Sequence, residues 1–401
     1  MEIKGKVSTA ICYASVVEEE AINQIKRMCD HEFTRGSKIR IMPDVHAGKG
    51  CTIGTTMTIT DKIVPNIVGV DIGCGMYTIK LGKADIDFKK VDKACNYIPS
   101  GRNVWKSRLE YFDLAALRCY RQLKDTKRLE RSLGTLGGGN HFIEIGVDSA
   151  DNKYLVVHSG SRNLGKQVAE YYQKLAIDLH AGKEDYFTKR DKLIDDYKKQ
   201  GRRSEIQKAL QDLEKQWKAK ESNIPNDLCY LYGSYLDDYL HDVVICQKFA
   251  ERNREKIAEI ILEHIDMKAI SSFHTVHNYI NSKEMILRKG AISAHKGELL
   301  LIPINMRDGS ILAEGKGNPD WNFSAPHGAG RIMSRTKAKQ TFDLNDYKKT
   351  MEGIYTTSVN KSTLDEAPMA YKSISDIIAD IQNCVDIIDI LKPVYNFKAA
   401  E

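Results

Sequence analysis

The sequence lacks the features that mark several large classes of protein. Its nine cysteines among 401 residues include no CxxC pair, which argues against a disulfide scaffold, a structural zinc finger or a thioredoxin-like redox motif. No apolar run approaches the roughly 18 residues of a membrane-spanning helix. The first residues have neither the basic start nor the apolar stretch of a signal peptide. We therefore expect a cytoplasmic protein without a membrane segment.

The composition is that of a globular protein. Hydrophobic residues make up 42% and charged residues 28%, which excludes wholesale disorder, collagen and low-complexity scaffolds. The length allows about two or three domains or one large domain with an insertion. Because no linker or internal repeat is visible, a single domain over 1–401 is the simplest interpretation. The net charge of +6 is compatible with a polyanionic partner but does not identify one.

Three kinds of patterning follow one another along the chain. Residues 1–163 and 284–330 alternate β-branched runs with Gly-rich turns, which is typical of strands. Residues 164–268 are predicted to form a helical insertion. Residues 374–391 are predicted as a further helix that Pro393 ends, with one apolar face formed by Ile377, Ile381, Val385 and Ile388. The expected fold class is therefore α+β, a single large mixed-sheet domain with a helical insertion.

The segment 183–221 within this insertion carries 12 basic and 9 acidic residues. Apolar residues at 206, 210, 213 and 217 form one stripe on an otherwise charged helix. Mixed charge usually marks an exposed face, so a solvated helical hairpin is the simpler interpretation. An arm that contacts RNA is the alternative.

Residues that can bind metal gather in Gly-flanked loops after strand-like runs. Asp71 and Cys74 lie three residues apart in GVDIGCGM, where the glycines allow both side chains to reach one point. A carboxylate and a thiolate suit zinc, manganese or iron, although the pair taken alone favours a buried cysteine beside a turn aspartate. His141 and His158 lie in similar loops, as does His277. The remaining histidines without such flanks are expected to be structural, namely His31, His180, His241, His264 and His295, and His274 stays ambiguous.

Groups that can bind phosphate lie in the same loops. Three successive glycines at 137–139 can expose backbone N–H groups to a phosphate. The string fits neither the Walker motif nor the dinucleotide fingerprint. Asn140 and Glu144 can hold a base or a ribose, and Arg162 can clamp a phosphate.

Taken together, these strings resemble the RtcB family of RNA-splicing ligases. The resemblance rests on PDVHAGKG (43–50), GVDIGCGM (69–76), GTLGGGNHFIE (134–144), HSGSRNLG (158–165), HN (277–278), RKGA (288–291), HGAGR (327–331) and DEAPMAYK (365–372). The strings occur in the family's order and span nearly the whole chain.

The resemblance implies a GTP- and manganese-dependent enzyme that joins RNA 3′-phosphate or 2′,3′-cyclic phosphate ends to 5′-hydroxyl ends. His327 would carry GMP, with Asp44 beside it. The ligands of a pair of manganese ions would be Asp71, Cys74, His141, His158 and His277, with Cys74 shared. The GTP contacts would be Asn140, Glu144, Asn305, Tyr371 and Lys398, of which Tyr371 would stack on guanine. The RNA or phosphate contacts would be Arg162, Lys289 and Arg331.

Two features distinguish this chain within the family pattern. Asn305 stands where many members have the serine of a Gly-Ser-Met-Gly turn, so the loop 303–309 is bulkier and charged. The chain also looks like a shorter bacterial variant that accompanies a release-factor homologue, which implies repair of ribosomal RNA rather than tRNA splicing. Archease is the other partner that the resemblance implies.

Two other classes of function use the same residues. One is a metal-dependent phosphodiesterase or phosphatase that acts on RNA ends without guanylylation. The other is a non-catalytic RNA-binding metalloprotein. Only the ligase consumes GTP while joining RNA. The metal is also open, because thiolate and imidazole ligands favour zinc over manganese thermodynamically.

Overall fold

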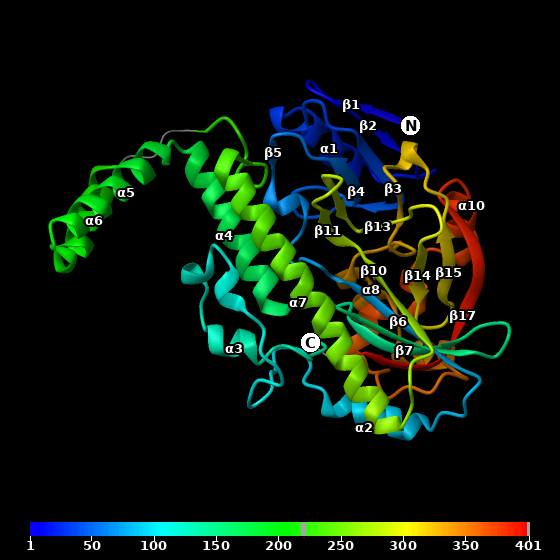
Figure 1. The fold of residues 1–401 in the computed structure, drawn as a ribbon. Coiled ribbons are helices and arrows are strands. Elements are labelled where there is room, and N and C mark those ends of the chain that lie inside the picture. Colours follow the sequence, from blue (N-terminus) through cyan, green and yellow to red (C-terminus); the bar gives the residue numbers. More distant parts are fainter. Residues whose placement is uncertain (218–221, 399–401) are drawn as a thin grey trace.

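A computed structural model describes residues 1–217 and 222–398 of the chain (Figure 1). One sheet of six strands has the order β1 (Glu2–Lys4), β2 (Thr9–Cys12), β3 (Ile39–His46), β4 (Ile53–Thr58), β12 (Ile286–Lys289) and β11 (Asn278–Asn281). A second sheet of seven strands has the order β10 (Ser271–Val276), β6 (Gly75–Gly82), β8 (Lys153–Ser159), β7 (Phe142–Val147), β17 (Val385–Lys398), β15 (Gly309–Gly315) and β14 (Leu299–Asn305). Two short pairs are β13 (Ala291–Ser293) with β16 (Ser324–Pro326), and β5 (Lys62–Ile63) with β9 (Leu231–Tyr232).

Strand pairing is mixed, as the sequence predicts. The pair β2 and β3 is parallel, whereas the other pairs of the two large sheets are antiparallel. The helices are α1 (Glu19–Cys29), α2 (Phe88–Tyr97), α3 (Thr126–Glu130), α4 (Arg162–His180), α5 (Glu184–Lys199), α6 (Ile206–Gln216), α7 (Gly233–Ile265), α8 (Arg335–Thr341), α9 (Leu344–Thr350) and α10 (Ile374–Ile381). The predicted α+β class is confirmed.

The helices α4 to α7 occupy the region 164–268 predicted as a helical insertion. The short strand β9 lies between α6 and α7. The long helix α7 crosses the molecule beside the sheets, and the α5–α6 hairpin projects away from the body (Figure 1). No residue of α5 is buried, which fits the solvated hairpin. The first half of α7 packs in one apolar core with the first sheet and α4. Its last turns pack in a second core with the second sheet and α2.

The prediction of one helix over 374–391 is wrong. The helix α10 ends at Ile381, and Val385 begins the long strand β17. Ile377 and Ile381 are buried as predicted, but Ile388 is 52% exposed on β17. Pro393 lies inside that strand, at an irregularity in its pairing with β7, where the missing N–H is tolerated.

No helix in the described ranges has both the length and the apolar character that crossing a bilayer requires.

Candidate active site

Four neighbouring strands bring the predicted metal ligands to one end of the seven-stranded sheet. Cys74 lies just before β6, His141 just before β7, His158 near the end of β8, and His277 just after β10. The strands are adjacent in the order β10, β6, β8 and β7, and each adjacent pair is antiparallel. The starts of β6 and β7 therefore meet the ends of β8 and β10.

Asp71 joins this group through the tight turn before β6. Gly73 adopts φ +78°, a conformation that glycine reaches at no steric cost. The N–H of Ser161 donates to Oδ1 of Asp71 at 3.0 Å. A Cβ at Gly160 would clash with the same oxygen, so the close approach of these two loops requires glycine.

Cys74 lies at the centre of the cluster. Its Sγ is 3.4 Å from Nε2 of His141 and 3.4 Å from Nε2 of His158. Nε2 of His141 also lies 3.1 Å from Oδ2 of Asp71. The Nδ1 of His141 lies 2.9 Å from the carbonyl oxygen of Leu136, so Nδ1 carries the proton and Nε2 presents its lone pair to the cluster.

The electrostatics of these side chains fit a metal site. Burial lowers the pKa of His158 and of His277 well below the usual range, so both rings are neutral and have a lone pair that can bind a metal ion. Burial and the Asp71 carboxylate raise the pKa of the Cys74 thiol well above its usual range, so the thiolate needs a cation beside it. Nδ1 of His158 and of His277 is buried without a partner in the described part of the chain. The donor set suits zinc, manganese or iron.

A row of four imidazole rings leads from the cluster to His327. The ring centroids of His141 and His158 are 5.3 Å apart, those of His158 and His277 are 5.1 Å apart, and those of His277 and His327 are 5.0 Å apart. His327 follows β16, which does not belong to the sheet that carries the metal ligands. Only the tertiary fold places it one ring beyond them.

Asp44, fully buried in β3, orients His327. Its Oδ2 accepts the backbone N–H of His327 at 3.1 Å and lies 2.6 Å from Nδ1 of the ring. This contact keeps the proton on Nδ1 and leaves the Nε2 lone pair available. His46, on the same strand, places its Nδ1 2.9 Å from the carbonyl oxygen of Asp44.

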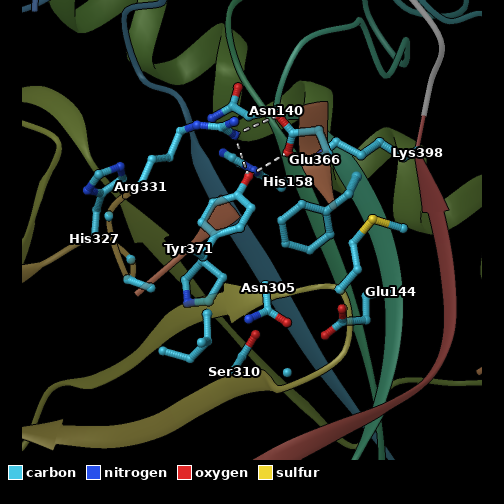
Figure 2. Close-up of a pocket in the computed structure, with 18 of the residues that line it drawn as sticks. Asn140, Glu144, His158, Asn305, Ser310, His327, Arg331, Glu366, Tyr371 and Lys398 are labelled. Atoms are coloured by element: carbon cyan, nitrogen blue, oxygen red, sulfur yellow. Dashed lines mark hydrogen bonds and ion pairs between the residues drawn. The ribbon is translucent and has the colours of Figure 1, made fainter. Parts of the chain in front are cut away.

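A cavity of about 240 Å³ adjoins the row of rings (Figure 2). It is lined by the histidines 158, 277 and 327 and also by Glu144, Tyr371 and Lys398. The row of imidazole rings and the residues predicted to contact GTP therefore line the same cavity. His46, which the sequence analysis did not single out, also lines it.

Glu144 and Asn396 each present one unpartnered oxygen beside this cavity. The register of β7 and β17 places Glu144 opposite Asn396, whose Nδ2 donates to Oε2 of Glu144 at 2.9 Å. Oε1 of Glu144 and Oδ1 of Asn396 are buried without a partner in the described residues. Burial raises the pKa of Glu144 to about 8. Two such oxygens can accept the N–H groups on the edge of a guanine base.

Glu366 contacts two of the other predicted nucleotide-binding residues, Tyr371 and Lys398 (Figure 2). Lys398 and the Tyr371 hydroxyl donate to its Oε2, the latter at 2.7 Å, and Arg335 lies 2.5 Å from Oε1. Burial alone would raise the pKa of Glu366, but Lys398 and Arg335 lower it to about 2. Arg331 lies over the Tyr371 ring, 5.0 Å from its centroid. Glu366 and Arg335 were missed from sequence, although DEAPMAYK contains the glutamate.

The side-chain amides of Asn305 and Asn140 differ in the hydrogen bonds that they form within the described part of the protein. Oδ1 of Asn305 accepts the N–H groups of Arg307 and Asp308 at 3.0 and 2.8 Å. Its Nδ2 donates to Oδ2 of Asp308 at 2.7 Å. The turn of the β14–β15 hairpin therefore uses most of this carboxamide, although the residue lines the cavity. Asn140 lines the cavity and is exposed.

The predicted phosphate contact Lys289 lies in a different setting. It is buried, and its ammonium donates to the carbonyl oxygens of Lys49, Cys51 and Asn66, the last two at 3.2 Å. Three acceptors satisfy the three N–H groups of an ammonium. This placement gives Lys289 a structural role in the loop at 49–51.

The guanidinium of Arg162 forms two hydrogen bonds close to the predicted metal ligands. Its Nη2 donates to the carbonyl oxygen of Gly101 at 3.0 Å, and its Nε donates to Oγ1 of Thr135 at 3.2 Å. A Cβ at Gly137 would clash with Nη1, so the guanidinium packs directly on the glycine loop. The Asp71 carboxylate partly offsets the lowering of the Arg162 pKa that burial causes.

The helix α7 contributes a buried asparagine that sequence reasoning missed. Oδ1 of Asn253 accepts the N–H groups of Gly134 and Thr135 at 2.7 and 3.1 Å. Its Nδ2 donates to Thr135 O, Ser159 Oγ and Gly160 O at 3.2, 3.0 and 3.1 Å. Asn253 thus joins the loop before His141 to the end of β8.

Arg254, the next residue, is fully buried and extends this connection. Its Nη1 donates to the carbonyl oxygens of Gly73 and Ser159 at 2.7 and 3.1 Å. Burial lowers its pKa to about 10, so it remains a cation at neutral pH near Cys74 and Asp71. Asn253 and Arg254 together link the three loops that carry four of the predicted metal ligands, namely Asp71, Cys74, His141 and His158. Their string, ERNREK, carries no glycine signal and looks like an ordinary charged helix.

Comparisons with known proteins find similar sequences over most of the chain. The sequence profile described as tRNA-splicing ligase RtcB matches residues 24–118 and 113–399. The chain is 31% identical to an RNA-splicing ligase RtcB of Escherichia coli (strain K12), over 89% of this chain and 88% of that protein. An RNA-splicing ligase RtcB1 of another Escherichia coli strain is 32% identical over the same shares of the two chains.

An archaeal relative extends the similarity beyond bacteria. The tRNA-splicing ligase RtcB of Aeropyrum pernix is 26% identical, over 86% of this chain and 84% of that protein. The matches cover nearly all of the chain, including each loop of the site. The chain therefore belongs to the RtcB family of RNA-splicing ligases.

Proposed function

We propose that the protein is a GTP- and manganese-dependent RNA ligase. It joins a 3′-phosphate or 2′,3′-cyclic phosphate end to a 5′-hydroxyl end through a GMP carried on His327. The observation that supports this most directly is the contact of 2.6 Å between Asp44 and Nδ1 of His327, beside a cavity shared with the metal-binding row. An oriented imidazole with a free Nε2 is a competent nucleophile.

In the first step, Nε2 of His327 attacks the α-phosphorus of GTP. A nitrogen–phosphorus bond forms, the bond from that phosphorus to the bridging oxygen breaks, and pyrophosphate leaves. Asp44 holds the proton on Nδ1 and stabilises the positive charge that develops on the ring.

The cavity supplies contacts that suit a guanine base. Glu144 can accept from the N–H edge, and Lys398 can donate to the carbonyl oxygen. Tyr371 presents a ring on which the base can stack. Glu366 fixes Lys398 and Tyr371 in place through its hydrogen bonds to both.

In the later steps the nucleotide activates the RNA end. An oxygen of the RNA 3′-phosphate attacks the phosphorus on His327, and the nitrogen–phosphorus bond breaks. The 5′-hydroxyl then attacks the RNA 3′-phosphorus, a 3′,5′-phosphodiester forms and GMP leaves. A 2′,3′-cyclic phosphate must first be opened by water to the 3′-phosphate.

Manganese would be held by Asp71, Cys74, His141, His158 and His277. Bound ions would neutralise charge on the triphosphate and on the transferring phosphoryl group. Zinc outbinds manganese at most thiolate and imidazole sites. We therefore expect protein purified without chelation to need exchange into manganese before it is active.

The first test is incubation with α-labelled GTP and manganese, without RNA, followed by denaturing electrophoresis. We expect a labelled band that is acid-labile, alkali-stable and absent from the His327→Ala variant. RNA-end hydrolysis without any such band, in protein of confirmed manganese content, would favour the phosphodiesterase instead.

For the physiological substrate, we propose damaged ribosomal RNA, because the chain looks like the shorter bacterial variant of the family. A release-factor homologue or archease would then be the partner to add. Cleaved ribosomes and tRNA halves, offered side by side to the purified protein, test this. Efficient joining of tRNA halves with no reaction on ribosomes would refute it.

A further inference from the structure

One segment of the chain outside the cavity carries most of the net positive charge. Residues 102–131 contain nine basic and four acidic residues, a net +5, whereas the whole chain has +6. Five of these cations are exposed and form no ion pair in the described part of the chain, namely Arg102, Lys106, Arg121, Lys124 and Lys127. By sequence, the segment 183–221 is more nearly balanced, with 12 basic and 9 acidic residues.

Two exposed aromatic rings belong to this segment or contact it. Tyr111 is 66% exposed and Tyr97 is 59% exposed. Arg108 lies over the Tyr111 ring, 5.6 Å from its centroid. Trp105 lies 5.2 Å from the ring of Tyr97. Exposed rings among cations suit single-stranded nucleic acid, because unpaired bases stack on the rings while the cations contact phosphates.

The surface is continuous with the loop that carries His141. The N–H of Gly101 donates to the carbonyl oxygen of Gly137 at 2.9 Å, and Nε1 of Trp105 donates to that of Gly134 at 3.1 Å. Arg162 binds the carbonyl oxygen of Gly101. The segment around α3 forms the outer edge of the molecule beside α7 (Figure 1). Two hydrogen bonds therefore join this segment directly to the glycine loop of the candidate site.

We propose that the surface formed by Tyr97, Arg102, Lys106, Tyr111 and Lys127, the basic–aromatic surface, binds the single-stranded RNA that leads to the reacting end. This inference rests on the proposed ligase function and names the substrate segment that the ligase holds. Duplex RNA is a poorer partner for this surface, because its paired bases cannot stack on exposed rings.

The test is RNA binding by the full-length Arg102→Glu/Lys106→Glu/Lys127→Glu variant, measured by fluorescence anisotropy with a labelled single-stranded oligonucleotide over a range of salt. We expect at least about tenfold weaker binding and a salt slope reduced by about 0.7 for each phosphate that the variant no longer neutralises. The matched control, Lys198→Glu/Lys199→Glu/Lys208→Glu, makes the same charge change on α5 and α6 and should bind as the wild type does.

Guanylylation of His327 without RNA separates this inference from the proposed function. We expect both charge variants to be labelled by α-labelled GTP like the wild type. Normal labelling with unchanged RNA binding in the first variant would overturn the surface and leave the ligase intact. If the wild type were not labelled, the proposed ligase function would be overturned. The comparison of RNA binding between the two charge variants would still test the proposed RNA-binding surface.

A second variant tests the stacking role. We expect Tyr111→Ala to weaken binding of single-stranded RNA by about tenfold or more and to leave duplex binding unchanged. Loss of RNA binding only in the α5–α6 control would place the strand on the projecting hairpin and overturn the proposal. Equal loss of single-stranded and duplex binding in Tyr111→Ala would overturn the single-strand preference.

Discussion

One carboxylate oxygen of Asp44 contacts both the backbone N–H and the ring Nδ1 of His327, at 3.1 and 2.6 Å. Asp44 comes from β3 of the six-stranded sheet, and His327 follows β16 of a separate short sheet. Because the two contacts share one oxygen, the position of the loop and the tautomer of the ring depend on the same side chain.

Asp44→Asn should slow guanylylation of His327 by about 10²–10⁴-fold, because an amide can donate to Nδ1 and favour the wrong tautomer. Label transfer from α-labelled GTP under single-turnover conditions measures this rate. Asp61→Asn, at a surface aspartate, is the matched control and should react normally. Wild-type rates in Asp44→Asn would show that the contact does not orient the nucleophile.

Cys74→Ser should weaken metal binding by at least about tenfold. The loss of a residue that only hydrogen-bonds to a metal ligand already lowers metal affinity by about that factor. Since burial raises the pKa of the Cys74 thiol, binding must displace a proton, and apparent affinity should rise with pH. Cobalt titration, read by the thiolate-to-cobalt band, and calorimetry in two buffers measure these effects. Cys384→Ser, a buried cysteine far along the chain, should retain the band. The same band in Cys74→Ser would exclude the thiolate as a ligand.

Glu144→Gln should change how stability depends on pH. The pKa of Glu144 is raised by burial from 4.5 to about 8, so between these values the folded state holds a proton that the unfolded state has lost. The wild-type free energy of unfolding should therefore fall, relative to the variant, by up to about 1.4 kcal/mol per pH unit as pH rises through this window. Urea unfolding of both proteins at several pH values measures it. Parallel curves would contradict the burial of an unpaired carboxyl.

Asn253→Ala should lower the free energy of unfolding by about 2–4 kcal/mol, because it leaves several buried backbone groups without partners. Metal affinity should also fall, since the loops at 134–141 and 158–160 lose a common anchor. Denaturant unfolding and cobalt titration measure the two effects. The control Asn96→Ala changes an exposed residue of α2 whose side chain donates to Asp92. Its free energy of unfolding should stay within about 0.5 kcal/mol of the wild type.

The predicted metal ligands show why part of the candidate site could be predicted from the sequence. Asp71, Cys74 and His158 lie in glycine-bearing strings at the ends of strand-like runs, and the sheet does bring these ends together. Glycines at 73 and 160 are visible in the sequence, and each meets a geometric requirement of the folded loops. Local chemistry and local backbone conformation carry this information, so no long-range contact has to be known.

The region after residue 374 shows where local reasoning fails. The spacing of Ile377, Ile381, Val385 and Ile388 fits a helix, yet the last two residues lie on β17. Strand β17 is held between β15 and β7, and these partners lie tens to hundreds of residues away along the chain. Short apolar runs fit either structure, so long-range pairing decides between them.

The chain of residues therefore specifies the chemistry of this protein: a thiolate, a carboxylate and several imidazoles in turns that only glycine permits. Their distances from one another are set by tertiary structure. The order of strands in two sheets places His327 beside His277 and buries Lys289 against backbone carbonyl oxygens. The packing of α7 brings Asn253 and Arg254 into contact with the loops that carry the predicted metal ligands. These contacts join segments far apart in sequence, and their energies depend on burial, which exists only once the sheets have packed against α7.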